Sequence, residues 1–175
     1  MKGLYLWLSF LLCSCAGAGP LPESPATQVV AVPNHFDDEP ECTVKLPETR
    51  AICSAKGCSM PVPKGSSLRS IELHFDCLPK RSPTGFDNPP DYVKVQPLRA
   101  RNSVGLLSLI DDTEGEPEEQ LRDLGFCLYG EQTNFCGYAK VLRLKDGEKA
   151  DATAAVKAFI EGIELRDQSK SKISK

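Results

Sequence analysis

Histidine is scarce in this chain, which holds only His35 and His74 in 175 residues. A Ser/His/Asp or Cys/His mechanism would have to use one of the two, and His35 lies in a proline-rich stretch where no rigid geometry is expected. The sequence also lacks a Gly-x-Ser-x-Gly motif, a His-Glu-x-x-His motif and a glycine-rich phosphate-binding loop. We therefore expect a protein without enzymatic activity.

The chain also lacks a strong excess of charge of one sign, because it has 21 basic and 24 acidic residues and a net charge of −3. This balance gives no indication of nucleic acid or of an acidic substrate as partner. The apolar run at residues 4–12 has only about nine residues, too few to cross a membrane. With Lys2 before it and small residues after it, the run predicts a secretory signal peptide over residues 1–18.

Two cleavage sites are compatible with this signal. The segment Leu12-Cys13-Ser14-Cys15 resembles the lipobox of bacterial lipoproteins, with a leucine three positions before the cysteine and a small residue directly before it. The resemblance implies that Cys15 is lipidated, palmitate included, and anchors a periplasmic or outer-membrane protein. Ala16-Gly17-Ala18 instead fits ordinary signal peptidase cutting before Gly19, which would release a secreted or periplasmic protein.

Eight cysteines are many for a chain of this length, and they indicate an oxidising compartment or a metal. The sequence has no Cys-x-x-Cys, so neither a thioredoxin-like site nor a zinc knuckle has its usual spacing. We predict no metal and no cofactor. Either cleavage leaves six cysteines free for the fold, because Cys15 is either lipidated or removed, and this even number predicts three disulfides. They are Cys42, Cys53, Cys58, Cys77, Cys127 and Cys136.

Turn positions favour one pairing of these cysteines. A two-residue turn at residues 131–132 would place Cys127 directly opposite Cys136 across a hairpin, within disulfide reach. A turn at residues 47–48 would do the same for Cys42 and Cys53. Cys58 and Cys77 would then pair with each other, although six cysteines allow fifteen connectivities.

The rest of the sequence predicts one domain with flanking segments. Residues 19–40 are proline-rich and acidic and suit a tether, interrupted by a short run at 28–32 that could add an edge strand. Residues 41–166 form the predicted single domain. The Lys/Ser-rich residues 167–175 predict a disordered basic tail.

Within the domain, alternating apolar residues predict strands at 42–46, 50–53, 69–77, 92–96 and 163–165, and a hairpin at 126–144. A single apolar stripe predicts a helix at 152–161, with Asp151 capping it. Residues 104–110 could be a strand or a helix, and residues 117–124 resemble a short helix. The expected fold class is therefore α+β: a small, mainly antiparallel, disulfide-stapled sheet with one C-terminal amphipathic helix packed on it.

Two regions are candidates for function. The turn-rich stretch 79–91 is long for a connection, and long loops often carry binding. Its aromatic and basic residues, with those just after it, form a candidate protein interface: Lys80, Arg81, Phe86, Tyr92, Arg99 and Arg101. His74 lies between Glu72 and Asp76 on the wet face of a strand, where the three could form a weak metal or acid/base cluster or simply a solvated polar face.

The leading hypothesis is a non-enzymatic, envelope-anchored or periplasmic module that binds another protein and no nucleic acid. The C-terminal order of hairpin, helix and short strand resembles small bacterial periplasmic lipoproteins, including immunity proteins of type VI secretion. The resemblance implies an immunity or inhibitor role and assigns no residues. The alternative is a small secreted or periplasmic hydrolase that uses His74 with a neighbouring carboxylate.

Overall fold

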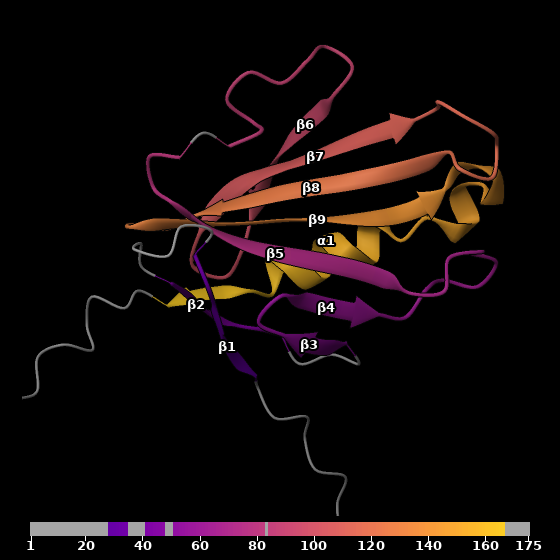
Figure 1. Ribbon diagram of the computed structural model, residues 1–175. Helices are drawn as coiled ribbons and strands as arrows, with labels where there is room; N and C mark the ends of the chain where they lie inside the picture. Colours follow the sequence, from indigo (N-terminus) through magenta and orange to yellow (C-terminus); the bar gives the residue numbers. More distant parts are fainter. Residues whose placement is uncertain (1–27, 35–40, 48–50, 83, 167–175) are drawn as a thin grey trace, which may run out of the picture.

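The computed structural model describes residues 28–34, 41–47, 51–82 and 84–166 (Figure 1). The predicted signal peptide, the predicted lipidation site Cys15, most of the predicted tether, His35 and the predicted basic tail lie outside the described residues. The short run that interrupts the tether forms strand β1 (Val29–Val32), in which Val30 and Val32 are buried. The fold therefore includes residues on the N-terminal side of Glu41.

A seven-stranded antiparallel sheet forms the body of the fold, in the order β3-β4-β5-β9-β8-β7-β6. Its strands are β3 (Ile52–Ser54), β4 (Gly57–Met60), β5 (Ile71–Pro79), β6 (Lys94–Arg99), β7 (Val104–Asp112), β8 (Leu121–Tyr129) and β9 (Thr133–Arg143). Strands β6 to β9 each pair with the next strand in the chain, and β5 pairs with β9, which joins the β3-β4-β5 part of the sheet to the β9-β8-β7-β6 part.

A second, smaller layer covers one face of this sheet. It consists of the three-stranded antiparallel sheet β1-β2-β10, with β2 (Cys42–Lys45) and β10 (Glu164–Arg166), and of the helix α1 (Thr153–Glu161). Two short 3₁₀ turns, η1 (Leu144–Asp146) and η2 (Glu148–Ala150), lead from β9 into α1. Figure 1 shows α1 behind β9 and β5, and the strand-rich α+β prediction is confirmed.

The core lies between the two layers because each layer presents an apolar face to the other. Strand β5 alternates as predicted, with Ile71, Leu73, Phe75 and Cys77 buried and the residues between them exposed. Helix α1 contributes its stripe of Val156, Phe159 and Ile160 to the same core. Burying such side chains supplies about 1.5–3 kcal/mol each, which holds the layers together.

One predicted element and one predicted strand pairing are wrong. Residues 117–124 do not form a helix: residues 117–119 turn, and β8 begins at Leu121 because Leu124, Phe126 and Leu128 alternate towards the core. Residues 42–46 and 50–53 do not form a hairpin, since β2 pairs with β1 and β10 in one sheet and β3 pairs with β4 in the other. The undecided run at 104–110 is a strand, β7.

The structure has three disulfides, and only one has the preferred pairing. Cys127 lies opposite Cys136 across the β8–β9 hairpin, as predicted, with 4.0 Å between their Cα atoms. The pairings of Cys42 with Cys53 and of Cys58 with Cys77 are wrong. Cys53 faces Cys58 across the tight β3–β4 hairpin, and Cys42 bonds Cys77 between the two layers.

Three disulfides indicate an oxidising, exported compartment, because cytosolic thiols are kept reduced. In the part of the chain that the structure describes, no helix has the length and apolar character needed to span a membrane.

Candidate functional site

The face of the large sheet that points away from α1 carries the candidate site. Its middle row runs across four strands, from His74 on β5 through Tyr138 and Gly125 to Ser108 on β7. The next row runs from Asp76 through the Cys136–Cys127 disulfide to Leu106. These outward side chains include large apolar and aromatic groups, which is unusual for a face that no layer covers.

The loop between β5 and β6 crosses part of this face. Asp87 fixes one end of it by accepting a hydrogen bond from the Thr84 backbone N–H at 2.6 Å. Further along, the Val93 backbone N–H donates to the Pro90 carbonyl oxygen at 2.9 Å. A turn built in this way presents its side chains at a defined height above the sheet.

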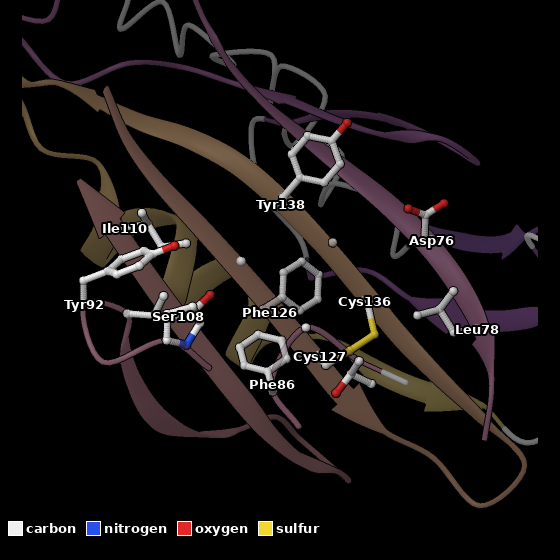
Figure 2. A pocket seen from close by; sticks show the side chains of 16 residues that line it. Asp76, Leu78, Phe86, Tyr92, Ser108, Ile110, Phe126, Cys127, Cys136 and Tyr138 are labelled. Carbon is white, nitrogen blue, oxygen red and sulfur yellow. A yellow bond between two sulfur atoms is a disulfide. The ribbon is translucent and has the colours of Figure 1, made fainter. Parts of the chain in front are cut away.

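A pocket of about 370 Å³ lies between this loop and the sheet (Figure 2). Gly125 creates its floor: a Cβ on that residue would lie 2.8 Å from the Ser108 Oγ and 4.0 Å from the Phe86 ring. Figure 2 shows Asp76 and Tyr138 on one side of the hollow and Tyr92, Ser108 and Ile110 on the other. The Cys127–Cys136 disulfide also lines it.

The pocket is mainly apolar, with a few polar groups at its border. Its apolar lining comes from both the loop and the sheet: Leu78, Phe86, Pro90, Val93, Ile110 and Phe126. Its polar groups are Asp76, Thr84, Ser108 and the hydroxyls of Tyr92 and Tyr138. Its volume is near the lower end of the range of about 300–1,000 Å³ for small-molecule pockets, so it suits one side chain or one small ligand.

His74 lies beside the pocket, on the same face. Its ring stacks on Tyr138, with 4.8 Å between the ring centroids and 22° between the planes. Glu72 accepts hydrogen bonds from the hydroxyls of Ser70 and Ser59, which lower the pKa of that carboxyl below its usual value. None of the described residues forms a hydrogen bond with the His74 imidazole, so the three predicted cluster residues are neighbours without a shared network.

The candidate interface residues divide into two groups. Phe86 and Tyr92 both line the pocket, and Tyr92 is 73% exposed. Lys80 donates to the Gly130 carbonyl oxygen at 2.7 Å and lies over the Tyr129 ring, away from the pocket lining. The other three are exposed: Arg81 in the loop, Arg99 at the end of β6 and Arg101 just after it.

Several pocket residues were not singled out from the sequence as part of a site, because they are distant in the chain. Ser108, Gly125 and Tyr138 come from three strands, and only the strand order places them in one row. In the sequence, Gly125 is typical of a residue that ends a helix. In the sheet, its lack of a side chain leaves the space that the pocket occupies. The one sequence signal that could have located this half of the pocket is the alternation of apolar and polar residues in β5 and β9, which places Asp76 and Tyr138 on the solvent-facing side.

A charge cluster lies next to the pocket, beyond Tyr92. Arg122 bonds Asp111 and Asp151, each at 2.7 Å, and also reaches Glu148 at 3.3 Å. The guanidinium holds the pKa of the Asp111 carboxyl below its usual value, and these carboxylates raise the pKa of Arg122. Since β7, β8 and the segment before α1 meet here, the cluster fixes the layers at this end. The described residues contain no group of three or more His, Cys, Asp or Glu side chains that could hold a metal.

Comparison with known proteins yields no relative: no family model, no curated protein and no solved structure matches the chain.

Proposed function

We propose that this protein is an exported, non-enzymatic binding module that captures another protein on the open face of its large sheet. The observation that carries the proposal is the pocket between the sheet and the 80–93 loop, with Tyr92 73% and Tyr138 55% exposed at its border. Exposed aromatic rings beside an apolar pocket are typical of the centre of protein interfaces, where a few residues supply most of the binding energy.

The rigidity of the face supports the same function. The Cys127–Cys136 disulfide lies in the pocket wall and joins the neighbouring strands β8 and β9, and the second layer supports the opposite side of the sheet. A surface that is ordered before binding loses little conformational entropy on binding, so more of the contact energy appears as affinity. Small inhibitors and immunity proteins use rigid surfaces of this kind, and that role is the finer form of our proposal.

The proposed location is the bacterial envelope. The lipobox-like segment at Cys15 would hold the protein at a membrane, and the proline-rich residues that follow would separate the folded domain from it. From there the open face could meet a partner that enters or resides in the periplasm.

Site-specific photo-crosslinking tests the interface. A benzoylphenylalanine is placed at Tyr92, at Tyr138 or, as a control, at Ala155, which is exposed on α1. After irradiation of native cells, we expect one and the same partner protein on the Tyr92 and Tyr138 variants and none on the Ala155 variant. The double substitution of Tyr92 and Tyr138 by alanine should abolish recovery of that partner without loss of folding.

Two results would contradict the proposal. One is a partner that crosslinks from Ala155 and from neither tyrosine position, which would move the interface to the helical side. The other is no protein product from any position in cells that contain the folded, correctly localised protein.

A further inference from the structure

The pocket combines aromatic rings with a single charged group. Asp76 is the one acidic or basic residue in the lining, and four aromatic residues supply the rings: Phe86, Tyr92, Phe126 and Tyr138. Asp76 is exposed on β5, opposite Cys136. Among the described residues, none forms an ion pair or a hydrogen bond with its carboxylate, so the negative charge has no internal counter-charge.

This composition selects among occupants. The faces of aromatic rings are electron-rich and attract cations, most of all when the cation is partly desolvated. A carboxylate at the border adds a direct charge attraction and a hydrogen-bond acceptor. A neutral apolar side chain would desolvate Asp76 without replacing its water contacts, which costs free energy. An anion would be repelled.

We infer that the pocket binds the guanidinium of an arginine side chain that the partner protein presents. Arginine fits better than lysine because its planar head stacks on rings and donates two parallel hydrogen bonds to one carboxylate. Its weaker hydration also makes entry into a mostly apolar pocket less costly. In this arrangement Asp76 receives the hydrogen bonds, and the rings on both sides of the hollow contact the guanidinium plane (Figure 2). The inference rests on the proposed function and specifies the chemistry of its partner.

The test uses small probes on the intact, oxidised domain. N-acetyl-arginine N-methylamide is titrated to tens of millimolar while backbone amide shifts are followed by NMR, and the neutral citrulline analogue and the lysine analogue are titrated in parallel. We expect saturable shifts at Asp76, Gly125 and Gly137 with the arginine probe. The citrulline probe should bind at least about tenfold more weakly, since it keeps the shape and loses the charge.

Variants locate the site. Asp76→Asn should weaken arginine binding about tenfold, and Tyr138→Leu should weaken it through loss of a ring. Asp91→Asn is the matched control, because Asp91 is an exposed carboxylate in the loop between β5 and β6 and is not part of the pocket lining. This variant should leave binding unchanged. The NMR spectra report directly that each variant is folded.

Three results would overturn the inference: no saturable shift with the arginine probe, equal binding of citrulline, or tighter binding of the lysine probe than of arginine. These outcomes are separate from those of the crosslinking experiment. If a partner crosslinks at Tyr92 and Tyr138 while the arginine probe does not bind, the proposed protein interface is supported and only the inference of an arginine ligand is overturned. Arginine binding without any crosslinked partner would instead identify a small-cation site.

Discussion

Cys42 and Cys77 are 35 residues apart in the chain and are bonded across the two layers, with 5.5 Å between their Cα atoms. Cys42 belongs to β2 of the small sheet and Cys77 to β5 of the large one, and both are buried. Asn34 extends the same junction through a parallel bridge to Cys77. The N-terminal strands are therefore covalently attached to the strand that also carries His74 and Asp76.

The Cys42–Cys77 disulfide should contribute more to the stability of the fold than the Cys53–Cys58 disulfide, which joins two neighbouring strands of one sheet. In the loop-entropy model, a bridge that closes 35 residues contributes about 4 kcal/mol, and the Cys53–Cys58 bridge, which closes only 5, about 2 kcal/mol. We expect the double alanine variant of Cys42 and Cys77 to lose about 2 kcal/mol more in the free energy of unfolding than that of Cys53 and Cys58. Urea denaturation of both variants measures the difference, and equal losses would contradict the prediction.

Much of the fold could be predicted because its information is local. The alternation of residues 71–77, the stripe of the helix and the turn between Cys127 and Cys136 each depend on residues within one or two elements. The wrong pairing of Cys42 with Cys53 has the opposite cause. A turn at residues 47–48 was plausible locally, but β2 inserts between β1 and β10, and no local pattern encodes that strand order.

The candidate site shows the same division. Phe86 and Tyr92 were identified from composition, because aromatic residues in a long loop are conspicuous. The other half of the pocket comes from strands whose register decides which residues are neighbours, and Gly125 and Ser108 carry no individual signal. Residues 117–124 were misread because a proline, two glutamates and a glycine resemble helix boundaries, while pairing with β7 and β9 outweighs that preference.

Acid should weaken the fold through the Arg122 cluster. The guanidinium lowers the pKa of the Asp111 carboxyl in the folded state. The pair therefore stabilises the fold fully at pH values above the ordinary aspartate pKa of about 3.9. This stabilisation is lost as the pH falls through the lower pKa of Asp111 in the folded protein. We expect the free energy of unfolding to fall more between pH 5 and pH 2 in the wild type than in Arg122→Met.

The same variant should also be less stable at neutral pH. The Arg122 side chain is only 17% exposed, and its loss leaves Asp151 without its ion partner, at a cost of about 1–3 kcal/mol. Lys157→Met is the control: it removes a surface pair with Glu161 and should cost under about 0.5 kcal/mol. Denaturant titrations at several pH values measure both effects, and parallel curves for wild type and Arg122→Met would contradict the assignment.

The proposed membrane anchor can be tested independently of the fold. If Cys15 is lipidated, Cys15→Ser should block maturation and release the protein from the membrane fraction of native cells. Cys13→Ser is the matched control, since Cys13 is not the cysteine that the lipobox-like segment would modify. Mass spectrometry of the mature N-terminus measures the outcome, and an unmodified N-terminus at Gly19 would show that ordinary signal peptidase acts instead.

The last prediction separates binding from catalysis. His74 is exposed, its ring stacks on Tyr138, and the hydroxyls of Ser59 and Ser70 bond Glu72. A solvated imidazole without a bonded nucleophile is a poor general base in this arrangement. We therefore expect His74→Ala to cost about 0.5 kcal/mol through the lost cross-strand ring pair, and to leave crosslinking of the partner at Tyr92 intact.

His74→Phe sharpens the comparison because it keeps an aromatic ring on Tyr138 and removes the two ring nitrogens. If, contrary to this expectation, partner recovery falls in His74→Ala and is restored in His74→Phe, the ring contributes to binding by positioning Tyr138. The hydrolase hypothesis makes the opposite prediction. It requires that purified wild-type protein hydrolyse a chromogenic ester or peptide substrate, and that both substitutions abolish this activity while thermal unfolding stays unchanged. That pair of results would place His74 in a catalytic role and would replace the binding function with an enzymatic one.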